Sequence, residues 1–230
     1  MRGRSSLVIT IDGPVAAGKT TAARQLAARL HFPLLDTGAI YRCVALQARR
    51  KGLDWSHEWA VSGVAAGLEI EFQTDAQAHR IFLDDVDVSE SIRAPEISRG
   101  ASIVSALPGV RAELLDVQRR QSAKGSLIAE GRDTGTVVFP HADRKFFLTA
   151  TPDVRAHRRF LELQGKGIEI DIRDVLAELG ERDHRDSSRA IAPLIPAADA
   201  ITIDSSRMSV DEVVAEMQRL VSDDRPQPDS

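Results

Sequence analysis

The residues of this chain best suited to chemistry lie near its start, in the segment Gly13-Pro14-Val15-Ala16-Ala17-Gly18-Lys19-Thr20. Their spacing fits G-x-x-x-x-G-K-[ST], a glycine-rich loop that binds phosphate groups. Glycines let the backbone turn tightly and bring its N–H groups close to an anion. Lys19 is expected to reach the β- and γ-phosphates of a nucleotide, and the Thr20 hydroxyl to bind Mg²⁺. The motif alone leaves kinases, ATPases, GTPases and non-catalytic nucleotide binders open.

The flanks of this loop predict the elements that position it. The apolar run Leu7–Ile11 before it is typical of a buried strand, and Thr21–Leu30 after it is rich in helix-forming residues. The amino end of such a helix adds partial positive charge and unpaired N–H donors. Strand, loop and helix in this order therefore make the prediction of a phosphate site strong.

Short apolar runs alternate with helical patterns along the chain, which predicts a parallel sheet with helices on both faces. The runs are Leu7–Ile11, Leu34–Leu35, Leu127–Ala129, Phe146–Thr149 and Ala200–Ile203. In such sheets ligands bind beyond the carboxyl ends of the strands. The polar residues that follow four of the runs are therefore candidates for the site: Asp12, Asp36, Glu130 and Asp204.

Residues Leu68–Val88 break this rhythm. Apolar and polar residues alternate in Leu68–Phe72 and in part of His79–Leu83, around a polar turn at Thr74–Ala78. This pattern predicts a small antiparallel insertion with one solvated face, and either a mobile lobe or a plain hairpin fits it. At the end of the chain we expect a helix over Val210–Val221, capped by Ser209 with Glu212, and then a flexible tail over residues 223–230.

Composition limits the classes of function. The net charge of −4 argues against a dominant basic face for nucleic acid, and the single cysteine, Cys43, excludes an internal disulfide. No stretch has the length of a membrane span or the apolar core of a signal peptide. We therefore expect a cytoplasmic protein that binds neither nucleic acid nor membrane, and a monomer.

Four further segments carry a resemblance to a known family. They are Leu35–Arg42 (LDTGAIYR), Asp87–Arg93 (DVSESIR), Glu130–Pro140 (EGRDTGTVVFP) and Glu181–Asp186 (ERDHRD). With the phosphate loop, they resemble bacterial cytidylate kinases along nearly the whole chain. The resemblance implies a five-stranded parallel core with helices on both faces, a small antiparallel insertion that binds the nucleoside monophosphate, and a short arginine-rich lid. The implied core covers residues 5–62, 94–152 and 190–222, the insertion about 63–93, and the lid about 153–189.

The resemblance also implies a reaction, in which ATP with Mg²⁺ transfers its γ-phosphoryl group to CMP or dCMP. Gly13 to Thr20, together with Thr21, would bind ATP. Arg42, Arg132 and Arg189 would hold the phosphate of the acceptor, and Lys19, Arg132 and Arg189 would act in catalysis. Two phosphate-bearing substrates need more cations than one lysine supplies, and arginine is the natural source.

By the same resemblance, Asp133 and Arg111 would bind the cytosine base, assisted by the Thr37 hydroxyl. Cytosine has an amino group at position 4, to which a carboxylate is complementary, whereas uracil has a carbonyl oxygen there. A carboxylate facing that oxygen would leave two buried acceptors without a donor, which disfavours UMP.

For the sugar the family implies Ser102, Arg182 and Asp186, with Asp186 aligning Arg182. Positions 182, 186 and 189 are spaced i, i+4, i+7, so they share one face if the segment is helical. An Arg–Asp–Arg row of this kind also fits an ordinary surface network of ion pairs.

The lid is expected to begin with a helix at Pro152 and to place Arg155, Arg158 and Arg159 on neighbouring faces, with Gly165 and Gly167 as hinges. Some of these arginines are predicted to close over the transferring phosphoryl group. Val15 departs from the small residues common in this loop of the family.

Two alternatives stay open. Another nucleoside monophosphate kinase, for UMP or AMP, would share the loop and the lid and differ at Thr37, Arg111 and Asp133. A nucleotide-dependent switch or binding protein would bind ATP without transferring phosphate, although the N-K-x-D segment of a GTPase is absent from the sequence.

Overall fold

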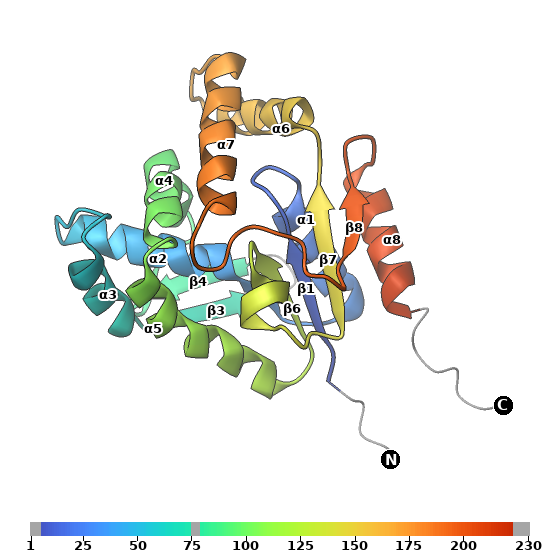
Figure 1. Ribbon diagram of the computed structural model, residues 1–230, viewed down its shortest axis with the longest axis horizontal. Helices are drawn as coiled ribbons and strands as arrows, with labels where there is room; N and C mark the ends of the chain where they lie inside the picture. The colour runs from blue at the N-terminus through green and yellow to red at the C-terminus, as the bar shows by residue number, and fades with distance from the viewer. Residues whose placement is uncertain (1–5, 75–78, 223–230) are drawn as a thin grey trace.

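A sheet of five parallel strands lies at the centre of the computed structural model, which describes residues 6–74 and 79–222 (Figure 1). The strand order is β2-β6-β1-β7-β8. The strands are β1 (Val8–Asp12), β2 (Leu34–Asp36), β6 (Leu127–Gly131), β7 (Arg144–Thr149) and β8 (Ile201–Asp204). Three of these strands contain a predicted apolar run in full, and β1 and β8 each lack only the first residue of theirs. The parallel pairing of the strands confirms the predicted sheet.

Helices cover both faces of this sheet, because its strands are apolar on both sides. Ile9 and Ile11 point into a core shared with α1 (Lys19–Leu30) and α8 (Val210–Ser222). Leu127 and Ala129 point into the other, larger core. That core is completed by α2 (Thr37–Arg50), α3 (Glu58–Ala66), α4 (Pro95–Val104) and α5 (Pro108–Arg119). Continuous apolar strands of this kind are typical of a sheet that is buried on both faces.

A second, antiparallel sheet forms the predicted insertion. It consists of β3 (Ile70–Thr74), β4 (His79–Leu83) and β5 (Val86–Asp87), in that order. Ile81 and Leu83 are buried against the larger core, whereas Arg80 is exposed and Phe82 is half-buried. This alternation confirms the expected solvated face. The turn predicted at Thr74–Ala78 lies almost wholly outside the described residues.

Two helices cross above the carboxyl ends of β1 and β7 (Figure 1). They are α6 (Pro152–Gly165), which begins at Pro152 as predicted, and α7 (Ile172–Ser187). A small core of their own joins them, with Ala156, Leu163, Val175 and Leu179 buried. Because α7 ends at Ser187, it contains Arg182 and Asp186 but not Arg189, so the helix face expected for a fully helical segment does not extend to Arg189.

The ends of the other helices follow the sequence closely. At the start of α8, the hydroxyl of Ser209 and the carboxylate of Glu212 form the predicted reciprocal cap. Short helical turns complete the structure: η1 (Ser91–Arg93), η2 (Arg120–Lys124) and η3 (Thr134–Val138). The predicted tail over residues 223–230 lies outside the described part of the chain. Among the described helices, none combines the length and the apolar character needed to cross a lipid bilayer.

Candidate active site

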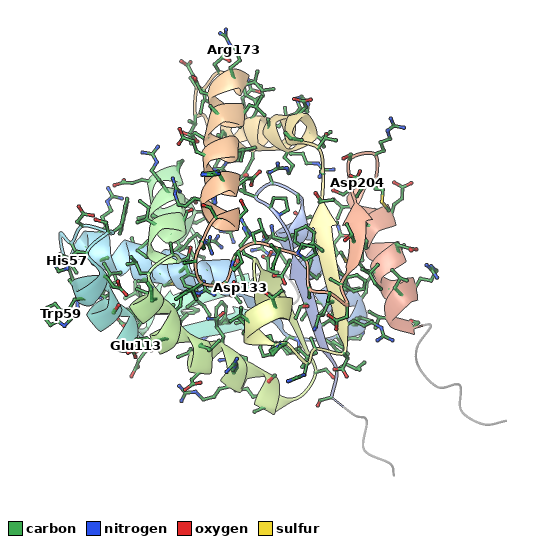
Figure 2. The ribbon with its side chains drawn as sticks, viewed as in Figure 1. His57, Trp59, Glu113, Asp133, Arg173 and Asp204 are labelled. Carbon is green, nitrogen blue, oxygen red and sulfur yellow. The ribbon has the colours of Figure 1, made fainter. Side chains whose placement is uncertain are left out.

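Strand register gathers polar side chains at one edge of the central sheet. Asp12 is paired with Gly131, and Asp36 with Glu130, at the carboxyl ends of neighbouring parallel strands. A cavity of about 490 Å³ opens at this edge. The fourth candidate, Asp204, lies at the carboxyl end of β8, which is the outermost strand on one side of the sheet. Figure 2 shows it well away from Asp133. Three of the four strand-end carboxylates therefore lie near the cavity, and Asp204 does not.

The phosphate loop forms one wall of the cavity. Gly13 has a φ of 146°, and a Cβ there would lie 1.9 Å from the Leu148 carbonyl oxygen, so only glycine fits. Gly18 takes the left-handed conformation at the amino end of α1, with a φ of 95°. Val15, Ala16 and the residues Gly18 to Thr21 line the cavity, whereas Gly13, Pro14 and Ala17 form the rear of the loop.

Lys19 is largely buried within this wall. Its ammonium group donates a hydrogen bond of 2.7 Å to the Pro14 carbonyl oxygen, within the same loop. Burial and the positive charge of Arg132 hold the pKa of Lys19 well below its ordinary value. Bound phosphate oxygens would raise the pKa of Lys19 again, since they add negative charge and hydrogen-bond acceptors next to the ammonium group. The lysine is therefore placed for an anion in the loop.

Asp36 organises the first acceptor-side arginine. One oxygen of its carboxylate caps α2 by accepting from the Ala39 N–H at 2.8 Å. The other accepts from Arg42 Nη2 at 2.8 Å. Arg42 is thus fixed one turn into α2, with its guanidinium on the cavity wall. A short strand that ends in Asp and continues directly into a helix is what places this arginine.

A cluster of arginines around Asp186 forms another part of the cavity wall. Arg132 Nε donates to the Asp186 carboxylate at 3.0 Å, and Arg189 pairs with its other oxygen. Burial alone would raise the pKa of Asp186, but the charges of Arg132, Arg189 and Arg182 together with the hydrogen bond from Arg132 outweigh it, so the pKa is lowered. Asp186 therefore aligns Arg132 and Arg189, whereas the sequence prediction had it align Arg182.

Arg182 faces the same cluster and has spare hydrogen-bonding capacity. Burial, followed by the charge of Arg132, lowers the pKa of Arg182 to about 9. Within the described residues, the buried Nε atoms of Arg42, Arg182 and Arg189 lack hydrogen-bond partners. Cations gathered this closely, with donors left over, are complementary to an anion that carries several oxygens.

A third group of side chains forms a polar cradle at the inner end of the cavity. Arg111 pairs with Asp133, donates to the Ser105 carbonyl oxygen at 3.1 Å and stacks over the Tyr41 ring at 5.7 Å. Thr37 donates its hydroxyl hydrogen to the Glu130 carbonyl oxygen at 2.7 Å. Toward the cavity the Thr37 hydroxyl can therefore only accept a hydrogen bond. Asp133 and Thr37 together present acceptors, and Arg111 presents donors.

Asp12 holds this cradle in place from below. Its buried carboxylate accepts hydrogen bonds from the Thr134 N–H, the Thr134 hydroxyl and the Gly135 N–H, at 2.9, 2.7 and 2.7 Å. These bonds fasten the turn that follows Asp133 to the end of β1. Burial raises the pKa of Asp12, although the hydrogen bonds oppose the shift. Asp12 thus positions Asp133 without lining the cavity itself.

Glu130 is the carboxylate of the cavity that is best suited to face a metal ion. Burial and the neighbouring Asp36 raise its pKa to about 7, and in the described structure its Oε1 atom is buried without a hydrogen-bond partner. Glu130, Asp36 and Thr20 all line the cavity. Among the described residues, no cluster of three or more His, Cys, Asp or Glu side chains could hold a metal by itself. The set fits Mg²⁺, which takes one or two protein oxygens and completes its shell with phosphates and water.

The three arginines predicted for the lid differ in where they point. Arg159 lines the cavity and pairs with Glu162 at 2.7 Å. Arg158 donates to the Ala17 carbonyl oxygen at 3.3 Å and to the Ser205 carbonyl oxygen at 2.7 Å, behind the phosphate loop. Arg155 is buried and also lies outside the cavity lining. Only Arg159 is therefore placed to face a ligand in this conformation.

All nine residues predicted to bind the acceptor line the cavity: Thr37, Arg42, Ser102, Arg111, Arg132, Asp133, Arg182, Asp186 and Arg189. The sequence analysis missed two further arginines on its wall, Arg24 and Arg93. Arg24 lies one helical turn beyond Thr20, a spacing that could have revealed it. Arg185 was also missed; it donates to the Ser102 hydroxyl at 3.0 Å and so ties α7 to α4.

Comparison with known proteins agrees with this arrangement. The sequence pattern of the family described as cytidylate kinase matches residues 9–223. A cytidylate kinase from Desulfitobacterium hafniense is 44% identical over 220 residues, covering 96% of this chain and 94% of its own. One from Pelotomaculum thermopropionicum is 48% identical over 207 residues, covering 90% and 92%.

Among solved structures, an uncharacterised protein from Eubacterium ventriosum superposes with a TM-score of 0.54 at 13% identity, which supports the fold alone. It covers 96% of this chain and 100% of its own. The match of the family pattern over most of the sequence, together with relatives of this identity and coverage, is decisive. The chain belongs to the cytidylate kinase family.

Proposed function

We propose that this enzyme transfers the γ-phosphoryl group of ATP to CMP or dCMP, giving ADP and CDP or dCDP. The observation that carries the proposal is that the phosphate loop, a cluster of arginines and the polar cradle of Arg111, Asp133 and Thr37 all line one cavity. Family membership supports the same reaction. We also propose that the enzyme works as a monomer in the cytoplasm, where its one cysteine stays reduced.

The donor is proposed to bind along the loop from Gly13 to Thr21. Backbone N–H groups and Lys19 would hold the β- and γ-phosphates. Mg²⁺, held by the Thr20 hydroxyl and the donor's phosphate oxygens, with Glu130 and Asp36 nearby, would neutralise charge on those phosphates. Arg159 would approach from α6 and help to exclude water from the site.

The acceptor's phosphate is proposed to bind between Arg42, Arg132 and Arg189. One of its oxygens would attack the γ-phosphorus while the bond from phosphorus to the β–γ bridging oxygen breaks, and ADP leaves. The reaction needs little covalent help from the protein and depends on alignment and charge neutralisation. Asp186 contributes by holding Arg132 and Arg189 on opposite sides of one carboxylate. Arg182 and Ser102 are proposed to bind the sugar.

The base is proposed to lie in the cradle of Arg111, Asp133 and Thr37. Asp133 and Thr37 both present acceptors, which matches the two hydrogens of the cytosine 4-amino group. Arg111 would donate to the ring's acceptor edge. Uracil places a carbonyl oxygen against the two acceptors, and buried groups without partners are rejected strongly. The cradle therefore favours CMP and dCMP over UMP.

The proposal is tested with a panel of nucleoside monophosphates in an assay of ADP release. CMP and dCMP should be turned over fastest, with UMP and AMP far behind. Faster turnover of UMP or AMP than of CMP would replace this acceptor with another on the same fold.

A further inference from the structure

Arg155 is the one lid arginine whose contacts reach three separate parts of the molecule. Its side chain is 7% exposed and lies near the amino end of α6. Nε donates to the Ala150 carbonyl oxygen at the end of β7, at 3.1 Å. Nη1 donates to the Val15 carbonyl oxygen in the phosphate loop at 3.2 Å and pairs with Asp183 on α7 at 2.7 Å. The guanidinium therefore joins the sheet, the phosphate loop and α7.

A second contact holds the phosphate loop at Val15. The side chain of Val15 packs against the small core between α6 and α7, where Ala156, Leu163, Val175 and Leu179 are buried. A glycine or alanine at position 15 would give the loop a smaller apolar contact or none at all. Arg155 and Val15 thus attach the loop to the two lid helices through its backbone and its side chain at once.

On the other side, Asp183 belongs to α7, the helix that carries two of the acceptor residues. It follows Arg182 directly and precedes Asp186 by one helical turn, and Asp186 aligns Arg132 and Arg189. The other Asp183 oxygen, Oδ1, is buried and lacks a hydrogen-bond partner among the described residues. Removing Arg155 would therefore leave a partly buried carboxylate uncompensated, which disturbs the helix that carries Arg182 and Asp186.

We propose that Arg155 is a positioning residue that couples the donor and acceptor halves of the site. When phosphates order the loop, the fixed Val15 carbonyl holds Arg155, and Arg155 holds Asp183 and the acceptor residues of α7. The acceptor then meets an arginine set that is already ordered, so the two substrates bind with positive cooperativity. Linkage requires the effect to be reciprocal. This inference rests on the proposed function, because it takes CMP as the acceptor and ATP as the donor.

The test is calorimetric titration of CMP into the whole enzyme, with and without Mg²⁺ and a non-hydrolysable ATP analogue. In the natural protein we expect the analogue to tighten CMP binding by about 5-fold or more, within the range common for coupled sites. We compare the dissociation constant for CMP without the analogue with the constant in its presence. Arg155→Met, Asp183→Asn and Val15→Ala should each bring the ratio of these two constants close to one. Arg155→Lys, which keeps a charge but cannot span both partners, should restore it only in part.

Arg173→Met is the matched control, because Arg173 is an arginine at the amino end of α7 that pairs with Asp171 in solvent. It should keep the ratio of the natural protein. Steady-state kinetics give a second readout: at saturating ATP, Arg155→Met should raise the KM for CMP much more than it lowers kcat. If Arg155→Met fails to fold by its thermal transition, Asp183→Asn and Val15→Ala decide the matter.

The possible results separate this inference from the proposed function. Folded variants that keep the natural ratio would overturn the coupling role, as would a natural protein that binds both ligands with a ratio of one. Failure of the natural protein to bind CMP at all would instead overturn the proposed function.

Discussion

The donor half and the acceptor half of the cavity are built in different ways. The donor half is one contiguous stretch, from β1 through the phosphate loop into α1, and its geometry is set by local backbone conformation at Gly13 and Gly18. The acceptor half takes side chains from α2, α4, α5, the turn after β6, and α7 with the segment that follows it, which are far apart in the sequence. A local motif can serve any reaction on a nucleotide, whereas an assembly of this kind defines a particular acceptor.

The largest effect is expected from the donor half. Lys19→Ala should lower kcat by roughly 100- to 1000-fold, because it removes a charge that stabilises the transferring group. CMP binding should change far less. Turnover and CMP titration measure the two effects, with the exposed Lys51→Ala as the control. Natural turnover in Lys19→Ala would remove this lysine from the mechanism.

A substitution in the acceptor half should weaken acceptor binding more than donor binding. Asp133→Ala should cost about 1.5–3 kcal/mol of CMP binding free energy, since a charged hydrogen bond to the base is lost and Arg111 is left unpaired. ATP binding should be almost unaffected, which titration of each ligand can check. Equal weakening of both ligands would show that Asp133 acts through the fold.

Asp12 should show a mixed pattern, because it belongs to the donor strand but holds the acceptor cradle. Asp12→Ala removes three buried hydrogen bonds and should lower the free energy of unfolding by about 1–3 kcal/mol or more. Chemical denaturation measures this loss. The KM for CMP should rise more than the KM for ATP; a rise for ATP alone would contradict the role given to Asp12.

The smallest effect is expected at Asp204, the strand-end carboxylate outside both halves. Its side chain accepts from the Ser206 N–H and hydroxyl at the surface. Asp204→Asn should leave both KM values and the midpoint of chemical denaturation almost unchanged, because the side chain lies at the surface. A large change in either KM would extend the site to the end of β8.

The same contrast explains what the sequence could and could not predict. β1, the loop and α1 follow from local pattern, and the strand-end rule located Asp36 and Glu130. Asp204 obeys the same rule but ends the last strand of the sheet, away from the cavity. Strand order depends on tertiary packing, so the sequence pattern could not separate these cases.

The lid helix α6 shows most clearly what the sequence pattern could not predict. Arg155, Arg158 and Arg159 are the same residue type on one helix, and periodicity alone cannot say which of them faces the ligand. The structure decides through the docking of α7, which brings Asp183 to Arg155, and of the β8–α8 turn, which brings Ser205 to Arg158. The pairing of Asp186 with Arg189 fits the i, i+3 spacing, but Arg189 lies beyond the end of α7 at Ser187, and the sequence pattern did not predict where that helix ends.

The donor and acceptor halves of the cavity act together in one phosphoryl transfer if the proposed reaction holds. The most direct measurement is to supply ATP labelled in its γ-phosphate together with CMP and to follow where the label goes. We expect the label to appear in the β-phosphate of CDP, in step with the formation of ADP. Label found only in inorganic phosphate, or retained on bound ATP, would contradict it.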